Sequence, residues 1–98
     1  MIDIRQLNYF IELVKTSSFT NAAQNMDVTQ PTLTRVLKEL EDELHTTLIE
    51  RNSKSFVVTD TGRALYEDAQ KLIQNVETIK SRINDIQHSK SGEVRLAV

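Results

Sequence analysis

The chain has 98 residues, of which 39% are hydrophobic and 27% are charged, and its formal net charge is −2. This composition is that of a folded globular protein rather than a disordered one, and the length fits one small domain with an appended element. The absence of cysteine excludes disulfides and thiolate metal sites. No signal-peptide layout and no apolar run of about 18 residues is visible, so we expect a soluble cytoplasmic protein.

Three amphipathic helices are predicted in the first half of the chain, where glycine is absent and proline occurs once. The first covers residues 3–16, with Asp3 as its N-cap, and the second runs from Phe19 to Met26 after a break and N-cap at Ser17-Ser18. The third is capped by Thr29 and has Pro31 in its first turn, where a missing N–H is tolerated. The apolar stripe of the first helix is Leu7, Phe10, Ile11 and Val14. The stripe of the third is Leu33, Val36, Leu37, Leu40 and Leu44.

The second and third predicted helices have the spacing of a helix-turn-helix. Ala23 is small enough to let two helices cross, and Asp27 stands four residues later, where the turn requires a positive φ. Leu33 follows six residues after Asp27 and can seal the crossing. We therefore expect the N-terminal part of the third helix to be the element that enters a DNA groove.

The polar face of the third helix carries side chains that can read base edges. Gln30 projects from its N-terminal end and can bond adenine, and Arg35 can bond guanine with two hydrogen bonds. Glu39 and the acids after it lie where an inserted helix leaves the DNA. The alternative interpretation is an ordinary solvated face. Candidate base contacts are Gln30, Pro31, Thr32 and Arg35, and candidate backbone contacts from this half are Ser18, Thr29, Thr34 and Lys38.

The next segment changes to the period of β-strands. Residues Thr47–Arg51 and Ser55–Thr59 are rich in β-formers and are separated by a polar turn, which predicts a two-stranded hairpin. Such a hairpin must lean on the helices, because two strands alone are marginal in water. Its tip would act as a wing laid along the DNA backbone, with polar and basic side chains on phosphates. The candidate contacts there are Arg51, Asn52, Ser53 and Lys54.

A long final helix is predicted from near Thr61 to about Gln87, capped by Thr59 or Asp60. Apolar residues recur along it at alternating spacings of four and three, which is a heptad seam that needs a partner helix. The simplest partner is a second copy of the chain, and the alternative is a neighbouring domain of a longer protein. The seam consists of Leu65, Ala69, Leu72, Val76, Ile79, Ile83 and Ile86.

Three regions follow from these patterns. Residues 1–59 are expected to form a winged helix-turn-helix, and residues 60–88 a linker helix for dimerisation. Residues 89–98 are expected to be a hinge and the first strand of a further domain, because Glu93–Val98 alternates polar and apolar side chains. The predicted fold class is therefore mainly α, with three helices, a two-stranded β-hairpin wing and a long dimerising helix.

No catalytic constellation is visible. His45 and His88 are isolated, and the acids at 39–43 occupy consecutive helical positions, which is typical of a solvated face. We therefore expect no enzyme and no metal site. Two functions remain open: sequence-specific DNA binding by a homodimer, and a helical protein-interaction module, for which the small negative net charge is the best argument.

Six segments together resemble the N-terminal domain of LysR-type transcriptional regulators. The resemblance is collinear and covers essentially the whole chain. The matching segments are Leu7-Asn8-Tyr9-Phe10, Ser18-Phe19-Thr20-Asn21-Ala22-Ala23, Val28-Thr29-Gln30-Pro31-Thr32-Leu33-Thr34-Arg35, Leu40-Glu41, Leu48-Ile49-Glu50-Arg51 and Thr59-Asp60-Thr61-Gly62.

The resemblance implies a winged helix-turn-helix whose linker helices pair antiparallel into dimers, with tetramers in full-length proteins. It also implies binding to interrupted inverted repeats near promoters and a C-terminal domain, absent here, that binds a small-molecule co-inducer. No cofactor is expected in this fragment. By position, Gln30, Pro31 and Arg35 resemble base contacts, and Arg51 and Lys54 resemble minor-groove or phosphate contacts.

The chain departs from the family pattern at four positions, the first three of them structural, and in its wing. His45 stands where a glycine is usual, Thr47 where proline is common, Ile49 where phenylalanine is common and Thr61 where alanine is usual. The wing carries fewer basic residues than many members have, which predicts a weaker groove contact from the wing.

Overall fold

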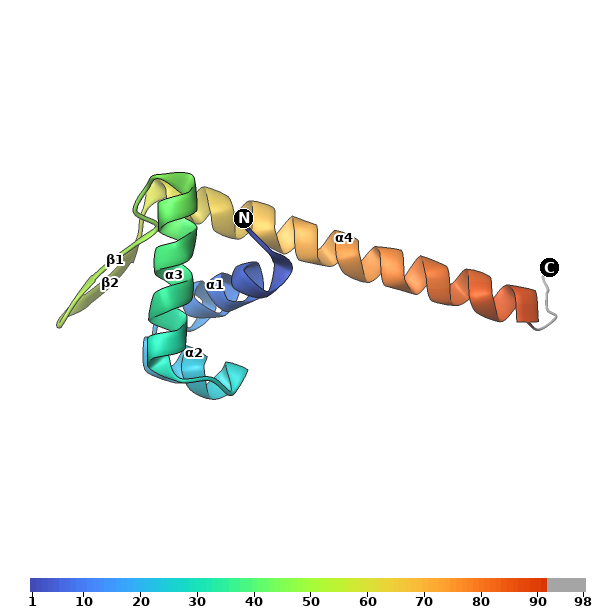
Figure 1. Cartoon of the computed structure of the whole chain (residues 1–98), viewed down its shortest axis with the longest axis horizontal. Helices are drawn as coiled ribbons and strands as arrows, with labels where there is room; N and C mark the ends of the chain where they lie inside the picture. Colours follow the sequence, from blue (N-terminus) through green and yellow to red (C-terminus); the bar gives the residue numbers. More distant parts are fainter. Residues whose placement is uncertain (92–98) are drawn as a thin grey trace.

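A computed structural model describes residues 1–91 of the chain, and Figure 1 shows a small head from which one long helix extends. The head combines three helices with an antiparallel hairpin, as predicted. The elements in chain order are α1 (Ile4–Thr16), α2 (Phe19–Met26), α3 (Gln30–Leu44), β1 (Ile49–Asn52), β2 (Ser55–Val58) and α4 (Asp60–Ser91).

Each of the first three helices begins at the polar residue expected to cap it. Asp3 accepts the backbone N–H of Gln6 in a capping box, Ser18 accepts that of Asn21, and Thr29 accepts that of Thr32. These side-chain oxygens satisfy backbone donors that have no partner inside the helix. The helix starts are therefore encoded locally.

Each of these helices also ends in a left-handed residue that is not glycine. The φ angles are 53° at Ser17, 59° at Asp27 and 57° at His45. The prediction that Asp27 takes a positive φ is confirmed, and its backbone N–H bonds to the carbonyls of Ala23 and Gln24. His45 takes the left-handed C-cap conformation at the position where the family pattern has glycine.

The core of the head is built from the apolar stripes of α1, α2 and α3. Phe10, Leu33 and Leu40 are fully buried, as their stripes predict, and Leu13 and Leu48 join them although neither was assigned to a stripe. Burying a side chain of this size stabilises the fold by about 1.5–3 kcal/mol. The stripe of α3 ends one turn earlier than predicted, because Leu44 is 38% exposed.

The hairpin is attached to the head at its base. Ile49 pairs with Val58 and Asn52 with Ser55, so the turn consists of Ser53 and Lys54 alone. Glu41 on α3 accepts the backbone N–H of Leu48 at 2.8 Å and that of Ile49 at 3.3 Å. This carboxylate fastens the start of β1 to α3.

Helix α4 starts where predicted and runs further than predicted. The Thr59 hydroxyl accepts the backbone N–H of Gly62 at 3.0 Å, so Thr59 is the cap. The helix spans 32 residues, about 48 Å at 1.5 Å per residue. It ends at Ser91 rather than near Gln87, so residues 89–91 of the expected hinge are helical. The strand expected at Glu93–Val98 lies outside the described residues.

The apolar seam of α4 divides into two parts. Ala69 is 2% exposed and lies in the core of the head, with Leu65 packed against that core. This corrects the expectation that all seven seam residues face a second copy, since Ala69 is covered within its own chain. Further along, where α4 leaves the head, Leu72, Ile79, Ile83 and Ile86 are between 44% and 54% exposed.

Among residues 1–91, no helix is both long enough and apolar enough to span a membrane.

Candidate nucleic-acid interface

The N-terminal part of α3 packs on the head through its inner face, while its outer face stays open. Leu33 and Leu37 bury the inner face, and the Thr29 cap organises the first turn. The hydroxyls of Thr29 and Thr32 lie 3.0 Å apart and bond to each other. Both hydroxyls are therefore already partnered within the helix start.

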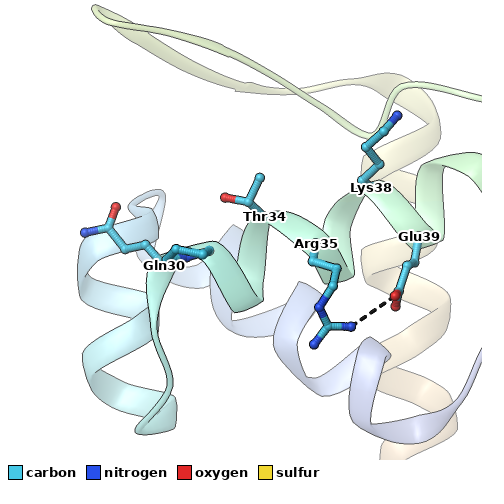
Figure 2. Close-up of a pocket in the computed structure, with 6 residues that line it drawn as sticks. Gln30, Thr34, Arg35, Lys38 and Glu39 are labelled. Atoms are coloured by element: carbon cyan, nitrogen blue, oxygen red, sulfur yellow. Dashed lines mark hydrogen bonds and ion pairs between the residues drawn. The ribbon is translucent and has the colours of Figure 1, made fainter.

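A shallow surface lies along the outer face of α3 (Figure 2). Gln30 extends freely from the first turn, and Thr34 and Lys38 point to one side of the helix, whereas Arg35 turns to the other side. Residues Gln30, Pro31 and Arg35 are exposed, and Thr32 and Thr34 are half-buried. The residues that line the surface are Gln30, Pro31, Thr34, Arg35, Lys38 and Glu39.

The two cations of this face are both paired with acids one helical turn further on. Arg35 Nη1 lies 3.0 Å from Glu39 Oε2, and Lys38 Nζ lies 3.5 Å from Asp42 Oδ1. Exposed pairs without further support are weak, so a stronger acceptor can displace Asp42 from Lys38. The acids at 39–43 are thus more than a solvated face: Glu39 and Asp42 pair these cations, and Glu41 binds backbone.

Arg51 connects the wing to both helices of the helix-turn-helix. Its guanidinium carbon lies 3.8 Å from the centre of the Phe19 ring, and its Nη2 donates to Thr34 Oγ1 at 3.3 Å. Phe19 also meets Phe56 of β2 edge-on, with ring centres 5.8 Å apart. Arg51, which is predicted to contact DNA, therefore also links β1 to α2 and α3.

The remaining predicted contacts lie at two other places. Ser18 caps α2 and is half-buried beside Phe19. Asn52, Ser53 and Lys54 are exposed at the wing tip, where Asn52 Oδ1 accepts the backbone N–H of Lys54 at 2.8 Å. The hairpin projects away from the free end of α4, with its tip well separated from α3 (Figure 1). The structure brings Thr34 and Arg51 together and leaves the wing tip as a separate surface.

Within residues 1–91, no group of three or more His, Asp or Glu side chains is placed to hold a metal ion.

Residues 4–63 match the family model described as the bacterial regulatory helix-turn-helix protein, lysR family. The chain belongs to this family. The relatives of this chain are transcriptional regulators rather than enzymes. The segment that the family model matches is the helix-turn-helix of such regulators.

Two relatives show how far the likeness extends. XapR of Escherichia coli K12, an HTH-type transcriptional regulator, is 34% identical over 96 residues, which cover 98% of this chain and 33% of XapR. BenM of Acinetobacter baylyi is 39% identical over 80 residues, which cover 82% of this chain and 26% of BenM. The chain thus spans about a third of the length of such relatives.

Solved structures share the fold as well as the sequence. The BenM_DBD/catB site 1 DNA complex superposes with a TM-score of 0.84 at 37% identity, covering 94% of this chain and 100% of that chain. The CbnR_DBD–DNA complex gives a TM-score of 0.84 at 30% identity, covering 88% of this chain and 99% of that chain. This LysR-family chain therefore has the winged helix-turn-helix of domains solved on DNA.

Proposed function

We propose that this LysR-family chain binds duplex DNA sequence-specifically as a homodimer, with the N-terminal part of α3 in the major groove. The wing then lies along the backbone or the minor groove. The chain acts as the DNA-binding part of a bacterial transcription regulator in the cytoplasm.

The observation that carries the proposal is the exposed tip of α3. Gln30, Pro31 and Arg35 are open on a helix whose opposite face is fixed by fully buried Leu33 and Leu40. A major groove admits one α-helix, and rigid support keeps its side chains in register with the base edges. Slightly shorter domains of the same fold have been solved on DNA.

Each side chain of the tip has a distinct role in this proposal. The Gln30 amide bonds adenine, the Arg35 guanidinium bonds guanine, and Pro31 with the Thr32 methyl makes apolar contact with thymine methyls. Backbone phosphates are met by hydroxyls, cations and one side-chain amide around this centre. We assign that role to Ser18, Thr29, Thr34, Lys38, Arg51, Asn52, Ser53 and Lys54.

The second copy docks on the free part of the α4 seam. Leu72, Ile79, Ile83 and Ile86 are exposed in a line along one face, with half-buried Val76 between them. Leu65 extends the seam toward the head, and Ala69 is left out because its own head covers it. A dimer presents two copies of α3, as a DNA site with two half-sites requires.

For the whole regulator, we propose a further domain that binds a small-molecule co-inducer, and a tetramer built from such dimers. Relatives are about three times as long as this chain, which leaves room for that domain.

Arg35→Ala tests the base-reading role directly. The variant is expected to lose roughly 1–3 kcal/mol of discrimination at one base pair of a bound duplex, because a bidentate contact to guanine disappears. The measurement is fluorescence anisotropy with a panel of single-substituted duplexes. Arg5→Ala at the start of α1 loses the same charge and is expected to keep the base preference.

Two outcomes would count against the proposal. An equal loss of affinity on every sequence would reduce Arg35 to a phosphate contact. A dimer that binds no duplex even at low salt, where DNA binding is strongest, would favour a protein-interaction module instead.

A further inference from the structure

Glu39 is held from two sides by residues of different helices. Its Oε2 lies 3.0 Å from Arg35 Nη1, and its Oε1 accepts the side-chain N–H of Gln6 on α1 at 3.0 Å. The other end of the Gln6 amide is also engaged, because its Oε1 accepts the backbone N–H of Asp3 at 3.0 Å. A chain of bonds therefore runs from the N-cap of α1 to the guanidinium on α3.

This anchoring separates the pair from an ordinary exposed ion pair. Two free side chains one turn apart gain little from pairing, because both must give up rotational freedom. Here the carboxylate is already fixed by Gln6, so only Arg35 has to be ordered. Glu39 and Arg35 keep 44% and 61% of their side-chain surface exposed, and Arg35 is turned toward Glu39 and away from Thr34 and Lys38 (Figure 2).

The pair leaves enough donors for a base. A guanidinium has five N–H groups, and the structure records one hydrogen bond from Arg35, made by Nη1. Two N–H groups suffice for the O6 and N7 atoms of guanine. Glu39 and a guanine can therefore be bound by Arg35 at the same time.

The charge of Glu39 also limits what else Arg35 can bind. A guanidinium paired with a carboxylate is neutral as a unit, and the carboxylate repels a nearby phosphate. Arg35 therefore gains less from the DNA backbone, which is present on every sequence, than from a purine edge, which is present only at some.

We propose that Glu39, held by Gln6, is a positioning residue that orients Arg35 and thereby sharpens its base preference. The inference rests on the proposed placement of α3 in the major groove. Glu39 acts through Arg35 and does not itself contact a base.

Glu39→Gln is the first test, read out as relative affinity for single-substituted duplexes of a selected site. We expect the preference at the pair read by Arg35 to fall about three- to tenfold, a part of what a bidentate contact supplies. Glu43→Gln is the matched control: it changes the charge equally on α3, but Glu43 pairs with the N-terminal amine at 3.1 Å. Both variants are expected to bind all duplexes somewhat more tightly, and only Glu39→Gln to lose preference.

Gln6→Glu tests the second half of the bond chain. The new carboxylate keeps an acceptor for the Asp3 N–H but removes the donor to Glu39 and repels it. We expect a smaller loss of preference than in Glu39→Gln, with an unchanged helical circular dichroism spectrum.

The decisive comparison uses the Arg35→Ala background, where Glu39→Gln is expected to have no further effect on base preference. A residual effect there would mean that Glu39 reads a base itself, and wild-type preference in Glu39→Gln would mean that it positions nothing. Either result would overturn this inference and leave the proposed DNA binding intact. Unchanged preference in Arg35→Ala would instead overturn the base-reading role of Arg35, and this inference with it.

Discussion

A chain carrying Ile79→Lys and Ile83→Lys is expected to sediment as a monomer and to bind its DNA site about 10²- to 10⁴-fold more weakly. Both isoleucines lie on α4 beyond the head, where they are 51% and 52% exposed. A second helix can cover at most that remaining half of each side chain. Over the four isoleucines of a dimer this amounts to roughly 3–6 kcal/mol, and four ammonium groups would have to be buried in their place.

The loss of DNA affinity follows from the loss of the second copy. Two linked heads bind two half-sites with the advantage of high effective concentration, which typically contributes a factor of 10²–10⁴. Analytical ultracentrifugation gives the mass, and anisotropy gives the affinity.

The control for this experiment adds the same charge to the opposite face of α4. Gln74→Lys plus Ser81→Lys changes two exposed positions that are offset by about 200° from the neighbouring seam residues. This variant is expected to remain a dimer. A double-isoleucine variant with the mass of the wild type would show that the seam is not the interface.

Gly62→Ala is expected to lower the free energy of unfolding by roughly 1–3 kcal/mol, the usual cost of overpacking. Gly62 is buried in the first turn of α4, where this helix packs against the base of the hairpin. A Cβ there would collide with the carbonyl oxygen of Leu48 and lie 2.9 Å from Val58 Cγ1. The carbonyl has little room to move, because it also accepts the backbone N–H of Thr59 at 3.0 Å.

Urea unfolding followed by circular dichroism measures this effect, at one fixed protein concentration because dimerisation contributes to stability. Ala64→Gly is the matched control, since it makes the reverse exchange of the same two residue types at an exposed position of the same helix. Its expected loss of about 0.5–1 kcal/mol gives the difference in helix propensity alone. A Gly62→Ala variant as stable as the wild type would show that α4 and the hairpin are less closely packed than described.

Features that depend on neighbours in the sequence could be predicted. Asp27 takes its positive φ as the C-cap of α2, where a left-handed residue is common and aspartate tolerates it, so a local rule contains this information. The same holds for the caps at Asp3, Ser18 and Thr29, whose hydroxyl or carboxylate reaches a backbone N–H three residues away.

Features that depend on partners distant in the sequence could not be predicted. Glu39 binds Gln6, which is 33 residues away, and Arg51 lies on the ring of Phe19. The heptad spacing assigns Ala69 to the seam, but spacing does not reveal that the head covers this part of the helix. Polar residues near 89–91 suggested a hinge, although they contain no helix breaker before Gly92.

The most direct test of base reading by paired α3 helices is selection of bound duplexes from a random pool with the wild-type chain. The proposed function predicts enrichment of two copies of one short sequence in inverted orientation, separated by a fixed interval. Retained duplexes without any enriched sequence, bound in a salt-dependent manner, would contradict base reading and leave only attraction to phosphates.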